Sequence, residues 1–385
     1  MSNKLLVLMI DGFRWDYFNK QGLELPGFSQ LFKEGVRSEY LEPVFPSLSY
    51  PNYYSLMTGL YCEDHGMVGN YMYDEERNEH FDMMANEECK NPHWWEGAEP
   101  FWITAVKQGK KTGMFEWSGG EFPHKGIRST FAVPVNGEKW PMVPEMKLNI
   151  DKAIELFKTD EIDMAGVYVA EMDDCGHFNT QDSSKLAQTI KAIDSVIKSL
   201  LDKLEAECLK DKVNIVIFSD HGMAEISDTR TVDISEHLNS KDVKVFTDRG
   251  NMCNIWPQEG KLDKVYCALQ GMKNSHIQVY KKEEIPDHWH YKNHKLVPPI
   301  TVTAETGWFI LTPKYPTVTC VGFHGYDNKD QDMRGIFLAT GPDIKKNFKI
   351  GHVQAVDVYQ VLCKLLQLSP LDHSGTWSNV EQMFV

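Results

Sequence analysis

Short runs dominated by apolar residues alternate along the chain with longer segments that carry apolar residues at helical spacing. Uninterrupted runs of this kind are typical of strands buried on both faces of a parallel sheet. They lie at Lys4–Ile10, Met164–Ala170, Val213–Phe218 and Gly335–Ala339. Shorter strand-like runs occur at Ile277–Tyr280 and Trp308–Leu311.

Two segments show the periodicity of amphipathic helices. Ser184–Cys208 places Leu and Ile at helical spacing, with Asp182 or Ser183 as its cap. Val353–Leu366 shows the same pattern, and Pro370 follows its end. The alternation predicts an α/β fold with a central, mainly parallel sheet and helices on both faces. Residues 225–315 are less regular, and we expect them to form an insertion within a single domain that spans residues 1–385.

Composition and charge narrow the function. The 385 residues have a formal net charge of −15, which argues against a nucleic-acid partner and is compatible with bound cations. No run approaches the roughly 18 apolar residues of a membrane-spanning helix, so we expect no transmembrane segment. The eight cysteines are widely spaced and lack a CxxC pair, a pattern that does not predict a disulfide scaffold.

Acidic residues and histidines follow three of the predicted strands. Asp11 follows the first strand, Asp173 and His177 follow the second, and Asp220-His221 follow the third. Ligands in open α/β sheets bind beyond the carboxyl ends of strands, so these side chains should converge. Asp and His are ligands that suit zinc. His324, between Gly322-Phe323 and Gly325, is either a turn residue or a further ligand, and the other histidines are interpreted as structural.

A serine precedes another predicted helix. Pro51 fits the first turn of a helix that runs through Ser55–Thr58, which would place Ser49 or Tyr50 at its cap. Ser49 either caps the helix or acts as a nucleophile, because a helix N-terminus and a nearby zinc would both favour its alkoxide. The sequence leaves both roles open.

Together these residues resemble the ectonucleotide pyrophosphatase/phosphodiesterase family of the alkaline phosphatase superfamily, from Leu5 to about Trp377. The motifs that carry the resemblance are Pro-Ser-Leu-Ser-Tyr-Pro-Asn-Tyr-Tyr at 46–54, Gly-Asn-Tyr-Met at 69–72, His-Gly-Tyr-Asp-Asn at 324–328 and Asp-Met-Arg-Gly-Ile-Phe-Leu-Ala at 332–339. The closest branch in this comparison is the choline-specific glycerophosphodiester phosphodiesterases. The resemblance implies an alkaline phosphatase-like fold and a phosphoric diester hydrolase.

The resemblance also implies roles for individual residues. A first zinc ion would be held by Asp11, Asp220, His221 and the nucleophile Ser49. A second zinc ion would be held by Asp173, His177 and His324. Asn70 matches the asparagine that donates to a phosphate oxygen. The reaction would pass through a phosphorylated serine.

The expected substrates are glycerophosphocholine and lysophosphatidylcholine, cleaved to phosphocholine. Nucleotide-cleaving branches have Lys-Thr where Leu48-Ser49 stand, and the loss of that lysine favours a choline substrate. Tyr50 and Tyr168 are expected at the rim of the metal site, where they would bind the trimethylammonium group through cation–π contacts. Glu171 and Asp248 are candidates for its counter-charge.

Other functions remain alternatives. A nucleotide phosphodiesterase or pyrophosphatase is the main one, since the two tyrosines could equally hold a base. A sulfatase is disfavoured because the chain has no Cys-x-Pro-x-Arg, and a binding module without turnover is disfavoured by the intact site. The resemblance implies an extracellular or cell-surface enzyme, yet the printed chain has no signal peptide, anchor signal or Asn-x-Ser/Thr sequon. The cellular compartment is therefore left open. A homodimer is also left open as a possible oligomeric state.

Overall fold

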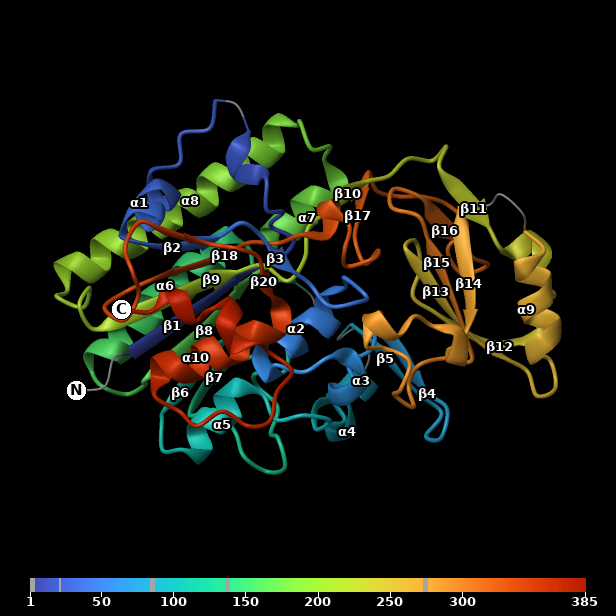
Figure 1. The fold of residues 1–385 in the computed structure, drawn as a ribbon, viewed down its shortest axis with the longest axis horizontal. Coiled ribbons are helices and arrows are strands. Elements are labelled where there is room, and N and C mark those ends of the chain that lie inside the picture. The colour runs from blue at the N-terminus through green and yellow to red at the C-terminus, as the bar shows by residue number, and fades with distance from the viewer. Residues whose placement is uncertain (1–3, 21, 84–86, 136–138, 273–275) are drawn as a thin grey trace.

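The computed structural model describes residues 4–20, 22–83, 87–135, 139–272 and 276–385. Its centre is an eight-stranded sheet with the order β19-β2-β18-β9-β1-β8-β6-β7 (Figure 1). These strands are β1 (Lys4–Ile10), β2 (Gly35–Ser38), β6 (Thr112–Phe115), β7 (Phe131–Val133), β8 (Met164–Val169), β9 (Val213–Phe218), β18 (Phe337–Thr340) and β19 (Phe348–Ile350).

The sheet is mainly parallel, as predicted, with one reversed strand. β1 pairs in parallel with both β8 and β9, so that Ile10 lies opposite Val169 and Met9 lies opposite Phe218. β18 is antiparallel to both β9 and β2. The sequence had grouped the run at 335–339 with the parallel strands, because apolar content carries no information about strand direction.

Helices cover both faces of the sheet. Alternate residues of β1 point to opposite sides, and both sides are buried because each faces a helical layer. Leu6, Leu8 and Ile10 belong to the core beneath α1 (Pro26–Glu34), α6 (Val143–Lys158) and α8 (Ser184–Ala206). Leu5, Val7 and Met9 belong to the core over α2 (Ser49–Thr58), α5 (Phe101–Lys107) and α10 (Val358–Leu366). In Figure 1, α1 and α8 lie above the sheet, and α5 and α10 lie below it.

The less regular region contains a second, four-stranded antiparallel sheet at one end of the molecule (Figure 1). Its strands are β12 (Val243–Thr247), β13 (Met252–Pro257), β14 (Ile277–Lys281) and β15 (Ile300–Ala304), and α9 (Leu262–Gln270) packs on it. The strand-like runs at 277–280 and 308–311 thus correspond to β14 and β16 (Phe309–Leu311). Division of the chain into domains stays a prediction.

The remaining short elements connect the two sheets and their helices. They are β3 (Leu41–Glu42), α3 (Cys62–His65), β4 (Tyr71–Asp74), β5 (Glu79–Asp82), α4 (Pro92–Trp95), α7 (Glu171–Phe178), β10 (Ala224–Glu225), β11 (Thr231–Asp233), β17 (Gly322–Phe323) and β20 (Val353–Gln354). Within the described ranges, no helix has the length and apolar content needed to cross a membrane.

The ends of two helices differ from the predicted positions. The long helix ends at Ala206, and Ser183 is its cap, accepting a hydrogen bond from the Leu186 amide at 3.1 Å. The last helix begins at Val358 rather than Val353, because residues 353–354 pair with β3 as a short parallel strand. Apolar spacing marked the hydrophobic segment correctly but not the point at which its backbone changes from strand to helix.

Candidate active site

The acidic residues and histidines predicted to converge do so at the carboxyl edge of three neighbouring strands. Asp11 follows β1, which lies between β8 and β9 in the sheet. Asp220 and His221 follow β9, and Asp173 lies shortly after the end of β8. Because parallel strands end at the same edge, three segments far apart in the chain deliver their polar side chains to one place.

A short helix that the sequence analysis did not anticipate positions Asp173 and His177. Both lie on α7, one helical turn apart, with His177 Nε2 at 3.4 Å from Asp173 Oδ2. The helix passes close to the turn after β1. Gly12 has a φ of +66°, and a Cβ there would lie 2.8 Å from the Asp173 Cα. Only glycine therefore permits this approach of the two chain segments.

Ser49 is the first residue of α2 and does not cap it. The N-cap is Leu48, so the expected cap at Ser49 or Tyr50 is wrong by one or two residues. The Tyr50 amide donates instead to Asn70 Oδ1 at 3.0 Å. The side chain of Asn70 thus performs the capping function from another part of the chain. The Ser49 hydroxyl is therefore not needed as a cap and is hydrogen-bonded to His221 Nε2 at 3.2 Å.

The three histidines share one orientation. Each Nδ1 contacts a backbone carbonyl: His177 that of Gly322 at 2.9 Å, His221 that of Gly222 at 2.8 Å, and His324 that of Ser47 at 3.1 Å. A carbonyl only accepts, so each Nδ1 carries a proton, and in a neutral imidazole Nε2 then presents a lone pair. Metal-binding histidines are commonly held in this way.

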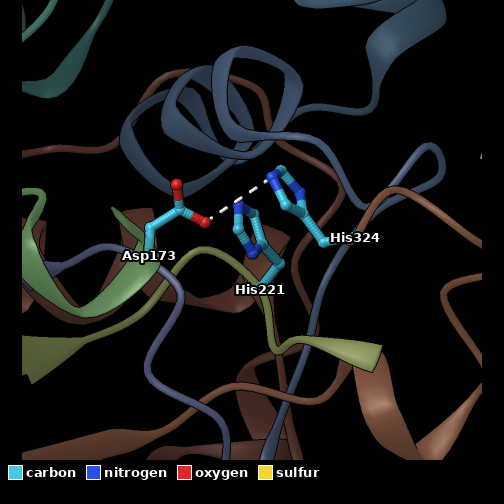
Figure 2. A group of neighbouring side chains, drawn as sticks. All are labelled: Asp173, His221 and His324. Carbon is cyan, nitrogen blue, oxygen red and sulfur yellow. Dashed lines mark ion pairs between the residues drawn. The ribbon is translucent and has the colours of Figure 1, made fainter. Parts of the chain in front are cut away.

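The imidazole lone pairs point at carboxylates. His324 Nε2 lies 3.6 Å from Asp173 Oδ1, with the His221 ring stacked on His324 at 3.6 Å between centroids (Figure 2). His221 Nε2 lies 3.1 Å from Asp220 Oδ2 and 3.4 Å from Asp11 Oδ1. These contacts are close enough for the paired atoms to share a cation.

The ligand atoms fall into two overlapping groups. Asp11, Asp220 and His221 form one group, and Asp173, His221 and His324 form the other, each with its atoms within 4.8 Å of one another. Asp11 Oδ1, Asp173 Oδ1 and Asp220 Oδ2 are buried without a hydrogen-bond partner. Buried carboxylate oxygens are costly unless paired, so these three fit metal coordination. His177 stands beside the second group, its ring 5.2 Å from that of His324.

Electrostatics also indicates a site built for positive charge. Burial raises the pKa of Asp11 to about 7, and the charge of Asp173 adds to the rise. Burial also raises the pKa of Asp220 well above its ordinary value, with Asp11 contributing. Burial lowers the pKa of His221 to about 4 and keeps the imidazole neutral, as a metal ligand must be. A bound dication would reverse the repulsion between the carboxylates.

A small cavity of about 110 Å³ opens beside Ser49 and Asn70. The rest of its wall includes Tyr71, Arg249 and Phe323, which the sequence analysis did not select. The Arg249 guanidinium lies 4.3 Å from the Tyr315 ring and 5.8 Å from the Tyr71 ring. Arg249 belongs to the segment after β12, far along the chain from Ser49, so no local sequence pattern linked the two residues.

The structure does not place Tyr50 and Tyr168 at a rim. Both are buried, with 1% and 2% of their surfaces exposed. The Tyr168 hydroxyl donates to Asp11 Oδ2 at 2.6 Å, and the Tyr53 hydroxyl contacts the same oxygen. The Tyr168 hydroxyl therefore orients the carboxylate of Asp11, which is a predicted metal ligand.

The two candidates for a counter-charge also have other partners. Glu171 Oε2 accepts from the Val143 amide at 2.8 Å. Asp248 is 4% exposed, and it accepts from the Tyr71 amide at 3.3 Å and from Asn254 Nδ2 at 3.0 Å. Burial raises the pKa of Asp248 to about 7. Because Tyr71 adjoins Asn70, Asp248 ties the Asn70 segment to the second sheet.

Removal of the Asp248 carboxylate should therefore misplace Asn70. We expect Asp248→Ala to lower kcat/KM roughly ten- to a hundred-fold, mostly through kcat, because small misplacements near a reacting group have effects of this size. Asp248→Asn, which keeps one acceptor, should recover much of the activity. Asp242→Ala, at the start of the same sheet, is the matched control. Equal kinetics for the alanine variants at positions 248 and 242 would contradict this role.

Comparisons with known proteins agree with the geometry. A family model described as type I phosphodiesterase / nucleotide pyrophosphatase matches residues 5–327. Human ectonucleotide pyrophosphatase/phosphodiesterase family member 5 is 36% identical over 383 residues, which cover 99% of this chain and 78% of that protein. A Xenopus laevis bis(5'-adenosyl)-triphosphatase is 33% identical over 390 residues, covering 98% of this chain and 81% of its own length.

A solved structure supports the same relationship. Murine family member 5 was solved as an inactive variant, with a threonine replaced by alanine, in complex with AMP. It superposes with a TM-score of 0.92 at 36% identity, and the match covers 100% of both chains.

Proposed function

The chain belongs to the type I phosphodiesterase / nucleotide pyrophosphatase family, and from this premise we propose that it hydrolyses phosphodiesters with Ser49 as the nucleophile. One observation carries the proposal. The Ser49 hydroxyl is relieved of capping by Asn70 and lies 3.2 Å from His221, the histidine shared by both ligand groups. In the murine relative, the variant in which a threonine is replaced by alanine is inactive. Loss of activity on removal of a hydroxyl group supports a hydroxyl nucleophile.

We further propose two zinc ions as cofactors. Asp11, Asp220, His221 and Ser49 would hold the first, and Asp173, His177 and His324 would hold the second. When bound, such ions stabilise negative charge on the attacking and leaving oxygens. Burial lowers the pKa of His221 and of His324, and these neutral imidazoles support the assignment together with the unpartnered carboxylate oxygens of Asp11, Asp173 and Asp220.

The residues of the chain would divide the reaction into two displacements. Ser49 Oγ attacks phosphorus, forming a P–O bond while the bond to the leaving alkoxide breaks. Water then attacks the phosphoserine and releases the phosphomonoester, which regenerates the serine. The positive end of α2 favours the anionic oxygens throughout. Asn70 contributes its free Nδ2, because its Oδ1 is already occupied by the Tyr50 amide.

Nucleotide-type phosphodiesters and pyrophosphates are the first substrate class. The relative named as a bis(5'-adenosyl)-triphosphatase and the murine structure in complex with AMP support this class. Arg249 in the cavity wall supports it independently, since a guanidinium there attracts a second phosphate and repels a quaternary ammonium group. Tyr71 and Phe323 add flat apolar surface suited to a base.

Choline phosphodiesters such as glycerophosphocholine and lysophosphatidylcholine are the second candidate. The observation that favours them is Leu48 directly before the nucleophile, where the nucleotide-cleaving branches have lysine. Tyr50 and Tyr168 are buried, so they do not form an aromatic clamp for a trimethylammonium group.

A comparison of two substrates tests the choice. We expect kcat/KM for diadenosine triphosphate to exceed that for glycerophosphocholine, and Arg249→Gln to lower the nucleotide value roughly ten-fold, as for one lost charge-assisted hydrogen bond. The choline value should not fall in this variant. Arg230→Gln, whose native side chain donates to the Glu225 carbonyl away from the cavity, is the matched control. A wild-type preference for glycerophosphocholine would reverse the ranking.

A further inference from the structure

A second cavity lies away from the ligand groups, between the segment after β1 and the three consecutive strands β18, β2 and β19 that lead to one edge of the central sheet. Its volume is about 400 Å³, within the usual range for small-molecule sites, and it shares no lining residue with the cavity at Ser49. Arg37, Arg334 and Lys349 line it, with Glu39 as the acidic residue among its walls. Three cations against one carboxylate form a positive cleft in a chain with a net charge of −15.

The two arginines of this cationic cleft are held by aromatic rings rather than by acids. The Arg334 guanidinium lies 3.9 Å from the Tyr40 ring centroid and 6.0 Å from that of Trp15. The Arg37 guanidinium lies 4.8 Å from the Phe32 ring. Stacking fixes the plane of a guanidinium but satisfies none of its N–H donors.

The donors of these cations remain available. Among the described residues, the side chains of Arg37, Arg334 and Lys349 make no hydrogen bond or ion pair. Arg37 and Arg334 are both partly buried, and a half-buried guanidinium without an acceptor is unusual enough to require an explanation. An oxyanion ligand would supply the missing acceptors through bidentate contacts.

The wall that carries Arg334 is firmly anchored. The Trp15 amide donates to the Arg334 carbonyl at 3.1 Å, and Trp15 Nε1 donates to the Gln331 carbonyl at 3.0 Å. The same wall comes from the Asp-Met-Arg-Gly motif at 332–335, which the catalytic assignment does not use. Arg334 is thus preorganised, so a ligand would not have to order it.

The remaining lining is apolar and includes Phe18, Ile336 and Leu338. From the combination of free guanidinium donors with an apolar floor, we propose that this cleft binds a small anion that carries at least two oxyanion charges on a ring or short apolar body. The site is additional to the proposed catalytic centre, and its occupancy does not depend on the choice of substrate there.

Naphthalene-1,5-disulfonate is a suitable probe, because it has this chemistry, contains no hydrolysable ester and is a poor ligand for metals. We expect saturable binding of one probe per chain in a fluorescence titration at low salt. Arg37→Gln and Arg334→Gln should each weaken it roughly ten-fold or more, as for one lost charge-assisted contact, and added salt should weaken it further.

Controls separate the two sites. Ser49→Ala should bind the probe as wild type does, and Arg128→Gln, at a surface arginine outside the cleft, should also bind normally. Phosphodiester hydrolysis should persist in Arg37→Gln, and a thermal melt verifies its folding. Should Arg334→Gln fail to fold, Arg37→Gln and Lys349→Gln carry the test. Absence of binding to wild type, or equal affinity in Arg37→Gln and Arg128→Gln, would overturn the proposal.

Discussion

Ser49→Ala is expected to reduce phosphodiester turnover by at least about 1000-fold while the protein keeps its fold and its metal content. The loss is large because the hydroxyl forms the covalent intermediate, and removal of a nucleophile commonly costs several orders of magnitude. Metal should remain because the other proposed ligands are Asp and His side chains that the substitution leaves in place. Single-turnover kinetics and elemental analysis on the same sample measure both effects.

Ser47→Ala is the matched control, two residues away. The Ser47 hydroxyl is fully buried and donates to the Tyr326 carbonyl at 3.1 Å, so it has a structural partner and does not face the ligand groups. Its loss should lower the melting temperature slightly and leave most of the activity. An active Ser49→Ala protein together with an inactive Ser47→Ala protein would transfer the role of nucleophile to Ser47.

Chelation of bound metal is expected to abolish activity and lower thermal stability together. Activity should fall by at least about 1000-fold, because charge on the attacking and leaving oxygens loses its strongest stabilisation. Stability should fall because a cation that binds only the folded state stabilises it. A bound cation would also offset the repulsion among the carboxylates of Asp11, Asp173 and Asp220. Differential scanning fluorimetry and an activity assay before and after chelation measure the two effects.

Addition of zinc should restore both properties. Asp220→Asn, which removes a ligand charge, should reproduce the loss of activity, whereas Asp228→Asn, in a turn outside the site, should behave as wild type. Full activity in excess chelator, with no metal detected by elemental analysis, would exclude the two-metal proposal.

The sequence was most informative where burial imposes a simple pattern. β1, β8 and β9 are buried on both faces, so each appears as an unbroken apolar run, and the polar residues after each run mark the carboxyl edge of the sheet. The convergence of Asp11, Asp173 and Asp220 followed from that geometry alone. The ends of α8 were predictable within two residues because Ser183 is an ordinary cap.

Other features depend on contacts that sequence periodicity does not encode. α7 has acidic residues throughout its first turn and lacks a broad apolar stripe, so it did not appear as a helix. The start of α2 was misplaced because Asn70, twenty residues later, supplies the cap. Arg249 and Asp248 reach the site from the second sheet, and only the tertiary fold shows that they adjoin Asn70.

The reversed strand β18 has a consequence for the order of events during synthesis on the ribosome. Within the part of the chain that the structure describes, the partners of β2 are β18 and β19, both formed from residues after 336, although β2 itself ends at Ser38. The nascent chain therefore carries the β2 segment without its strand partners until residues 337–350 have emerged. Such delayed, long-range pairing slows folding and leaves an unpaired strand edge that is prone to aggregation. Strand β2 is thus the segment on which a chaperone would have the longest time to act.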